Sequence, residues 1–224
     1  YMTIFDESSL LFSEKPKKLV ILLHGYGDHA ENFIPLTKYF NDNTLEVNYF
    51  APNAPFIVPQ YPPGRQWFNP YPNGIHYNEA GPEEKAIMQQ ECETSIKLLE
   101  EYINKLCSLN NLSHQDCFLI GFSQGAMIAF ELGNFMRKTF AGCVMLSGRM
   151  LSSHSLDNNL FINTPLMIAH GDSDDLVNPK YFTEACQIAK SNGFTVEEHL
   201  MKGEGHTISS KTLQLVQNFI KKYV

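Results

Sequence analysis

Short apolar runs alternate with amphipathic stretches along most of this chain. The apolar runs are short enough for strands and cover residues 19–23, 45–50, 117–120, 143–146, 166–169 and 195–200. Buried strands that alternate with helical stretches are typical of a parallel sheet, because helices then cover both faces of that sheet. The pattern predicts an α/β fold with a mostly parallel sheet and helices on both faces.

Helices are predicted where apolar residues recur every three to four positions. The clearest helix covers about residues 84–106, in which Leu98, Tyr102 and Leu106 lie opposite charged positions. Residues 125–130 are apolar nearly all round, which is typical of a fully buried helix. A last helix is expected from about residue 209 to 223, with one apolar face.

Length and composition predict a single domain. The 224 residues are 43% hydrophobic, which is enough to bury one core, so we expect one domain over residues 1–224. Tyr1 precedes Met2, and we expect Tyr1 to be a remnant of cloning. The first residues lack the basic start and apolar core of a signal peptide, and no apolar run reaches membrane-spanning length. We therefore expect no membrane span.

Charge and cysteine content narrow the expected location and partners. The net charge of −7 and the lack of a basic stripe argue against binding to nucleic acid. The five cysteines are odd in number and have no paired spacing, which is typical of small core residues in a reducing compartment. These features predict a cytoplasmic protein.

The motif Gly121-Phe122-Ser123-Gln124-Gly125 carries the most chemical information in the chain. It lies between a predicted strand and a predicted helix, so Ser123 would sit on a sharp, strained turn that glycines make possible. Its hydroxyl would project at a helix N-terminus, where unpaired N–H groups favour a developing oxyanion. This is the nucleophile elbow of α/β-hydrolases, and it predicts that Ser123 is a nucleophile.

A nucleophilic serine needs a histidine base and an orienting acid, which follow it in that fold in the order Ser, Asp or Glu, His. Asp174 lies in a polar turn after the strand at 166–169, and His206 lies in a glycine-rich loop after the last predicted strand. We assign Asp174 as the acid and His206 as the base. Asp172 and Asp175 are alternatives for the acid, although Asp172 could equally cap the turn.

The other histidines fit the role of base less well. His170 ends a strand, where structural hydrogen bonds to the following turn are expected. His199 lies inside a strand pattern, and His76, His114 and His154 lie in polar loops where a solvated imidazole is the default.

A second oxyanion donor is expected from the loop after the first buried strand. This loop reads His24-Gly25-Tyr26-Gly27-Asp28, and the backbone N–H groups of Tyr26 and Gln124 would converge on the substrate carbonyl oxygen. A rival interpretation makes His24, Asp28 and His29 metal ligands. The two glycines favour a backbone role, so we predict no metal site.

These motifs together resemble the phospholipase/carboxylesterase family of α/β-hydrolases, which includes the acyl-protein thioesterases. The similar pieces are His24 to Asp28, Gly121 to Ala126, His170 to Val177 and Gly205-His206, in the order of the family. The resemblance implies an esterase, lysophospholipase or thioesterase without a cofactor, which acts on a small ester or thioester or on an acylated protein. It also implies Ser123, Asp174 and His206 as the triad, and the amides of Tyr26 and Gln124 as the oxyanion hole.

A segment dense in proline and aromatic residues, 52–82, bears on the substrate. We expect a long ordered excursion without regular structure, and its rings form either an apolar wall for an acyl chain or a cover for the core. Trp67 and Phe68 in this segment, and Leu176 after the acid, are candidate substrate contacts. Arg65 is either a substrate contact or one half of an internal ion pair.

Two further hypotheses stay open. A catalytically silent α/β-hydrolase would bind a small acyl ligand or a protein partner, but such proteins usually have a damaged triad. The aromatic segment could also dock onto a membrane or onto a second copy of the chain, so a homodimer is kept as a hypothesis.

Overall fold

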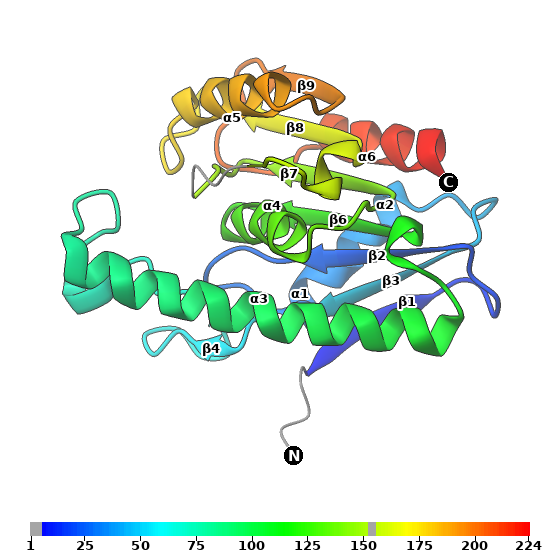
Figure 1. Ribbon diagram of the computed structural model, residues 1–224, viewed down its shortest axis with the longest axis horizontal. Helices are drawn as coiled ribbons and strands as arrows, with labels where there is room; N and C mark the ends of the chain where they lie inside the picture. Colours follow the sequence, from blue (N-terminus) through cyan, green and yellow to red (C-terminus); the bar gives the residue numbers. More distant parts are fainter. Residues whose placement is uncertain (1–5, 152–155) are drawn as a thin grey trace.

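The computed structural model describes residues 6–151 and 156–224. Within these residues the central sheet has seven strands in the order β1-β3-β2-β6-β7-β8-β9 (Figure 1). Neighbouring strands are parallel, except that β1 pairs with β3 in antiparallel fashion at one edge. The strands are β1 (Glu7–Leu11), β2 (Lys18–Leu23), β3 (Val47–Pro52), β6 (Cys117–Phe122), β7 (Gly142–Leu146), β8 (Leu166–Gly171) and β9 (Val196–Met201).

The predicted α/β fold is confirmed, because all six predicted strands are present and the sheet is mostly parallel. The sequence analysis missed β1, whose residues alternate between exposed and half-buried positions. Such an edge strand is held mainly by its backbone pairing with β3, so it lacks the apolar run that marks a buried strand.

Helices cover both faces of the sheet (Figure 1). On β2, Leu19 and Ile21 share a core with α3, α4 and α5, whereas Val20 and Leu22 share a second core with α1, α2 and α6. This alternation follows from the strand repeat of two residues. The helices are α1 (Ala30–Phe33), α2 (Thr37–Phe40), α3 (Pro82–Asn110), α4 (Gln124–Met136), α5 (Lys180–Ser191) and α6 (Ser210–Tyr223), with short 3-10 helices at Ile34–Leu36, Pro72–Gly74, His114–Asp116 and Leu160–Asn163.

The predicted helices are present, with different ends. Helix α3 begins two residues earlier than expected because Pro82 suits the first helical turn and the Glu84 carboxylate accepts a hydrogen bond from the Gly81 N–H. It ends at Asn110, after which Asn111 takes a left-handed conformation with φ 58°. Helix α4 is buried along nearly all its length and starts directly after Ser123.

The proline-rich segment 52–82 contains a small hairpin that was not expected. Strands β4 (Phe56–Ile57) and β5 (Arg65–Gln66) pair in antiparallel fashion. The prediction of no regular structure was therefore wrong at these four residues and at the 3-10 helix Pro72–Gly74. The hairpin forms because a turn closes it: the Val58 N–H donates to the Gly64 carbonyl at 2.9 Å, and the Gly64 N–H donates to Tyr61 at 2.7 Å.

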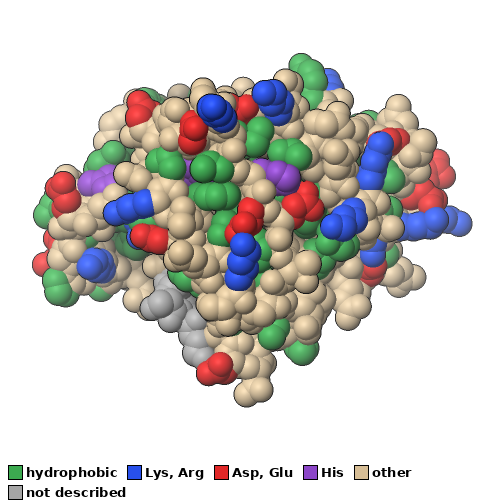
Figure 2. Space-filling model, turned by 90° about the horizontal axis from the view of Figure 1, so that it is seen from above, with side chains coloured by type: hydrophobic (Ala, Val, Ile, Leu, Met, Phe, Trp, Pro, Cys, Tyr) green, Lys and Arg blue, Asp and Glu red, His purple; other side chains and the backbone are tan. Residues whose placement is uncertain are grey.

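The distribution of charged side chains is relevant to polyanion binding, and the composition of the helices is relevant to membrane insertion. Figure 2 shows Lys and Arg interspersed with Asp and Glu on the face seen there, without a broad patch of one sign. Within the described part of the chain, no helix combines the length and the apolar composition required to cross a bilayer.

Candidate active site

Ser123 stands on a sharp turn between β6 and α4. Its backbone has φ 55° and ψ −117°, a conformation that a non-glycine residue adopts only under strain. The turn is tight because two glycines let the chain pass closely. A Cβ on Gly121 would lie 2.2 Å from the Gly125 carbonyl oxygen, and a Cβ on Gly125 would lie 2.0 Å from the Leu23 carbonyl oxygen. The G-x-S-x-G pattern is therefore a steric requirement here.

The structure brings Ser123, His206 and Asp174 together from three separate loops. The His206 Nε2 atom lies 2.9 Å from the Ser123 Oγ atom. The His206 Nδ1 atom lies 2.7 Å from the Asp174 Oδ2 atom. Because an ionised carboxylate only accepts, Nδ1 carries the proton and donates it, which leaves Nε2 free to accept the serine proton. This chain of contacts has the direction needed to activate a serine.

The Asp174 carboxylate is held in place by the backbone of its own loop. Its Oδ1 atom accepts the N–H groups of Leu176 at 2.9 Å and Val177 at 2.8 Å, and the residue is 5% exposed. Asp172 instead accepts the Gly203 N–H at 2.7 Å and ties two turns together, while Asp175 is exposed. Hydrogen bonds to Ser173 and Gly203 lower the pKa of Asp172. Asp174 alone of these three carboxylates contacts His206 in the described structure.

His170 lies beside the same carboxylate in a supporting position. Its Nε2 atom is 2.8 Å from the Val177 carbonyl oxygen and 3.3 Å from Asp174 Oδ2. Burial lowers the pKa of His170, so we treat the ring as neutral, with Nε2–H donating to Val177. The 3.3 Å approach to Asp174 is then not an ion pair, because the neutral ring carries no charge. His170 makes the structural bonds that the sequence predicted.

The remaining histidines lie away from the triad. His199 pairs with Glu197 on β9, His114 contacts Asn104, and His76 accepts the Asn78 N–H. His154 lies outside the described residues.

The loop of Tyr26 runs directly beside the elbow. A Cβ on Gly25 would lie 3.5 Å from the Ser123 Cβ atom, so the loop after β2 packs directly against the elbow. The Gln124 N–H belongs to the first residue of α4 and has no partner within the helix. Gly25, which directly precedes Tyr26, and Gln124 therefore both lie next to Ser123.

The side chain of Gln124 and the side chain and carbonyl of His24 connect the elbow and the loop after β2 to the segment 54–68 by hydrogen bonds. The sequence analysis predicted neither of these roles. Gln124 Oε1 accepts the Trp67 N–H at 2.7 Å, and Gln124 Nε2 donates to the Phe68 carbonyl at 2.9 Å. His24 Nε2 accepts the Ala54 N–H at 3.0 Å, while Trp67 Nε1 donates to the His24 carbonyl at 2.9 Å. No local pattern reveals these partners, because they join residues 30 to 57 positions apart.

His24 is kept neutral by its surroundings. Burial lowers the pKa of His24 from 6.5 to about 4. Both ring nitrogens are used, since Nδ1 also lies 2.8 Å from the Gly25 carbonyl oxygen. The His24 ring therefore has no free nitrogen for a metal ion, and among residues 6–151 and 156–224 no group of three or more His, Cys, Asp or Glu is arranged to hold one.

The candidate substrate contacts lie in different surroundings. Trp67 and Phe68 are 0% and 1% exposed and belong to the core, so in this structure they offer no surface to a substrate. Leu176 is 75% exposed beside the acid. Arg65 is half-buried, and its backbone bonds to Gly27 and Asp28 connect the hairpin of β4 and β5 to the Tyr26 loop.

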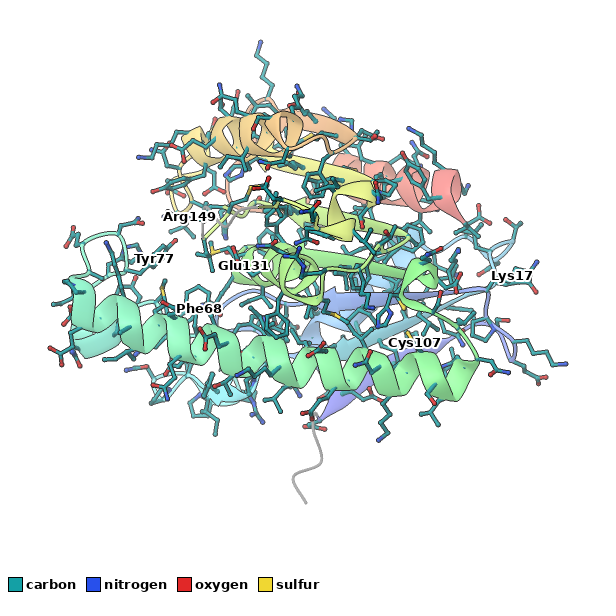
Figure 3. All side chains as sticks on the ribbon, viewed as in Figure 1. Lys17, Phe68, Tyr77, Cys107, Glu131 and Arg149 are labelled. Carbon is teal, nitrogen blue, oxygen red and sulfur yellow. The ribbon has the colours of Figure 1, made fainter. Side chains whose placement is uncertain are left out.

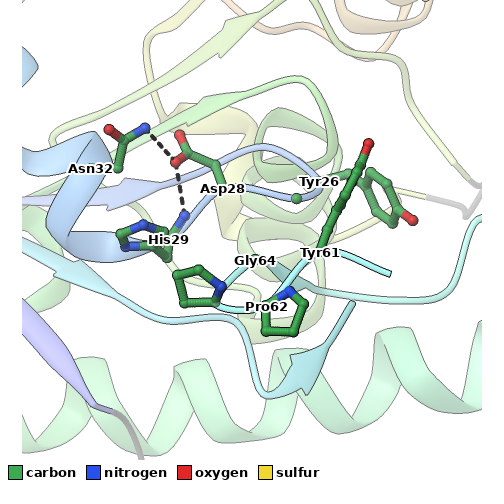
Figure 4. A pocket seen from close by; sticks show the side chains of 9 residues that line it. Tyr26, Asp28, His29, Asn32, Tyr61, Pro62 and Gly64 are labelled. Carbon is green, nitrogen blue, oxygen red and sulfur yellow. Dashed lines mark hydrogen bonds between the residues drawn. The ribbon is translucent and has the colours of Figure 1, made fainter. Parts of the chain in front are cut away.

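The Tyr26 loop borders an open cleft of about 640 Å³ (Figure 4). In this cleft Asp28 accepts hydrogen bonds from the Asn32 side chain at 2.7 Å and from the His29 N–H at 2.9 Å. The opposite wall is the turn from Tyr61 to Gly64. Tyr26 lines this cleft, whereas Ser123, Gln124 and His206 are not among its lining residues.

Comparison with known proteins gives a consistent result. A family model described as Phospholipase/Carboxylesterase matches residues 12–224. Acyl-protein thioesterase 1 of Candida albicans is 28% identical, over 93% of each chain. Carboxylesterase SOBER1 of Arabidopsis thaliana is 24% identical, over 92% of this chain and 90% of that one. The crystal structure of esterase PE8 matches with a TM-score of 0.86 at 27% identity and covers 98% of this chain and 99% of that one.

Proposed function

This chain belongs to the phospholipase/carboxylesterase family of α/β-hydrolases and is a serine hydrolase of carboxylic esters or thioesters, and we propose that Ser123 is its nucleophile, His206 its general base and Asp174 its orienting acid. The observation that supports these roles most directly is the continuous set of contacts from Ser123 Oγ through the His206 ring to Asp174 Oδ2. A catalytically silent hydrolase, the alternative, would have no reason to keep this chain of contacts intact.

Acylation follows from the direction of these hydrogen bonds. His206 Nε2 takes the Ser123 proton as Oγ attacks the substrate carbonyl carbon, and the imidazolium that forms is stabilised by Asp174. The negative charge moves to the carbonyl oxygen, where we propose that the N–H groups of Tyr26 and Gln124 bind it. His206 then returns the proton to the departing alcohol or thiol, which leaves an acyl-Ser123 ester.

Deacylation repeats the same proton transfers with water. His206 removes a proton from the attacking water, the two amides again bind the oxyanion, and Ser123 leaves with the proton that His206 carries. The Asp174 carboxylate is held toward His206 by the N–H groups of Leu176 and Val177, which donate to its other oxygen. The cycle needs only groups of this chain and one water molecule.

A covalent reagent tests the nucleophile. An organophosphonate should label Ser123 with one equivalent in the native protein, and Ser123→Ala should lose both this label and the hydrolysis of a short nitrophenyl ester. Ser123→Ala that still turns over this ester at the wild-type rate would contradict the mechanism. A folded wild-type protein that neither reacts nor hydrolyses would favour the silent alternative.

The proposed function extends to the class of natural substrate and to the cellular location. The relatives named acyl-protein thioesterase support a thioester of a protein cysteine as the substrate class, and the name carboxylesterase supports oxygen esters as well. We propose a cytoplasmic location, because all five cysteines are buried and free. The homodimer stays a prediction, which light scattering of the purified chain tests.

A further inference from the structure

Arg149 lies at the same edge of the sheet as the triad but has no role in the mechanism above. It follows β7 by three residues, and the chain just before it presses against the elbow. A Cβ on Gly148 would lie 2.6 Å from the Ala126 Cβ atom and 3.2 Å from the Ser123 carbonyl oxygen. The backbone that carries Arg149 is therefore fixed against the proposed nucleophile.

The Arg149 side chain is clamped between two aromatic rings. Its Cζ atom lies 4.0 Å from the centroid of the Tyr181 ring and 5.3 Å from that of Tyr77. One guanidinium nitrogen donates to Asn78 Oδ1 at 2.7 Å. Tyr181 belongs to α5, which follows the Asp174 loop, whereas Tyr77 lies in the segment before α3 (Figure 3). Stacking on two rings fixes the plane of the guanidinium group.

The positive charge of Arg149 is not neutralised within the described structure. No carboxylate of residues 6–151 or 156–224 forms an ion pair with it. Its Nε atom is buried and has no hydrogen-bond partner among these residues. A guanidinium group presents five donors in a planar fork that matches a carboxylate, and a buried donor without an acceptor is costly. The guanidinium group is thus charged and held in a fixed orientation, while part of its hydrogen-bonding capacity has no partner among the described residues.

Arg149 also borders a cleft of about 860 Å³ between α3 and α4. Met88, Ile96 and Leu151 contribute apolar surface to it. Its charged lining has more cations than carboxylates, with Lys85, Lys97, Arg137 and Arg149 against Glu93 and Glu131. Glu131 makes interactions of its own. In a chain with a net charge of −7, this local excess of positive charge favours an anionic group.

We propose that Arg149 is a specificity-determining residue, which binds a carboxylate carried by the substrate next to the ester or thioester that Ser123 attacks. The inference rests on the proposed function, since it concerns the same reaction. The carboxylate can belong to the acyl part or to the leaving group, because the position of Arg149 directly after Gly148, which packs against the elbow, does not distinguish the two sides of the scissile bond. A charge-assisted hydrogen bond of this kind changes affinity by about 10- to 100-fold.

Two pairs of matched esters test the proposal. Ethyl hydrogen adipate and ethyl hexanoate differ only by a carboxylate on the acyl chain, and 3-acetoxybenzoate and 3-methylphenyl acetate differ by a carboxylate on the leaving group. For each pair the ratio of kcat/KM, charged over neutral ester, is measured in wild type and in Arg149→Gln. We expect this ratio to fall about tenfold or more in at least one pair, and the pair that responds identifies the side of the carboxylate.

Lys180→Gln is the matched control, because Lys180 also lies over the Tyr181 ring, at 5.0 Å from its centroid, but is exposed. Removing this surface charge should change the ratio by less than about twofold. Arg149→Lys keeps the charge and loses the planar fork, so it should show a smaller fall than Arg149→Gln. If Arg149→Gln does not fold, the ratios of wild type are compared with those of Arg149→Lys alone.

A merely structural Arg149 would lower both rates of a pair together and leave the ratio unchanged. Ratios in a folded Arg149 variant that equal those of wild type in both pairs would overturn the inference. This failure differs from a failure of the proposed function, in which wild type would hydrolyse neither the charged nor the neutral esters.

Discussion

Replacing Asp174 by asparagine tests the proposed triad most sharply, because the change keeps the shape of the side chain. Asp174 Oδ1 accepts two backbone N–H groups, from Leu176 and Val177. The amide oxygen must stay at this position, since an NH₂ group there would face two donors. The NH₂ group of the asparagine then points at His206 Nδ1, in place of the Oδ2 atom that lies 2.7 Å away.

This orientation would exchange the donor and acceptor roles in the contact between residue 174 and His206 and in the contact between His206 and Ser123. His206 Nδ1 would have to accept, so its proton would move to Nε2, which faces the Ser123 hydroxyl at 2.9 Å. A protonated Nε2 cannot take the serine proton. The wrong tautomer of a triad histidine lowers kcat by about 10⁴-fold, which corresponds to about 5.5 kcal/mol of transition-state stabilisation.

The assay is the steady-state hydrolysis of a short nitrophenyl ester by Asp174→Asn, with thermal unfolding to verify the fold. Asp172→Asn and Asp175→Asn are the matched controls, and both should stay within about tenfold of wild type because neither carboxylate contacts His206. An Asp174→Asn variant within tenfold of wild type, or a larger loss in either control, would refute the assignment of the acid.

Other predictions concern the support of the site. Gly125→Ala would press a Cβ against the Leu23 backbone, so thermal unfolding should show a loss of about 3 kcal/mol or more, or no folded protein. Gln124→Ala removes the side-chain acceptor of the Trp67 N–H and the side-chain donor to the Phe68 carbonyl, which should cost about 2–5 kcal/mol in urea unfolding. The lowered pKa of His24, about 4, means that the unfolded chain takes up this proton first as pH falls. Stability should therefore fall between pH 6.5 and about 4, by about 3 kcal/mol, and His24→Gln should remove this slope in unfolding titrations.

The sequence by itself determined the architecture and identified the residue that we propose as the nucleophile. Strand patterns near Leu19, Cys117 and Leu166 are local, since each buried strand needs apolar residues regardless of its partners. The elbow is local as well, because the close passage of the chain at Ser123 depends on glycines two residues away on either side. Such signals lie within a few residues and can be read without the fold. The edge strand β1 was missed because its stability comes from pairing with β3 and not from its own composition.

Only the tertiary structure decided which side chains meet. Asp172, Asp174 and Asp175 have the same chemistry in one short turn, and the backbone donors that orient Asp174 toward His206 appear only when the loop is folded. Trp67 resembled a substrate contact but is buried in the core. The clamp around Arg149 joins three segments that are distant in sequence. Hydrogen bonds and stacking act over a few ångströms, so they depend on packing that no local pattern of residues specifies.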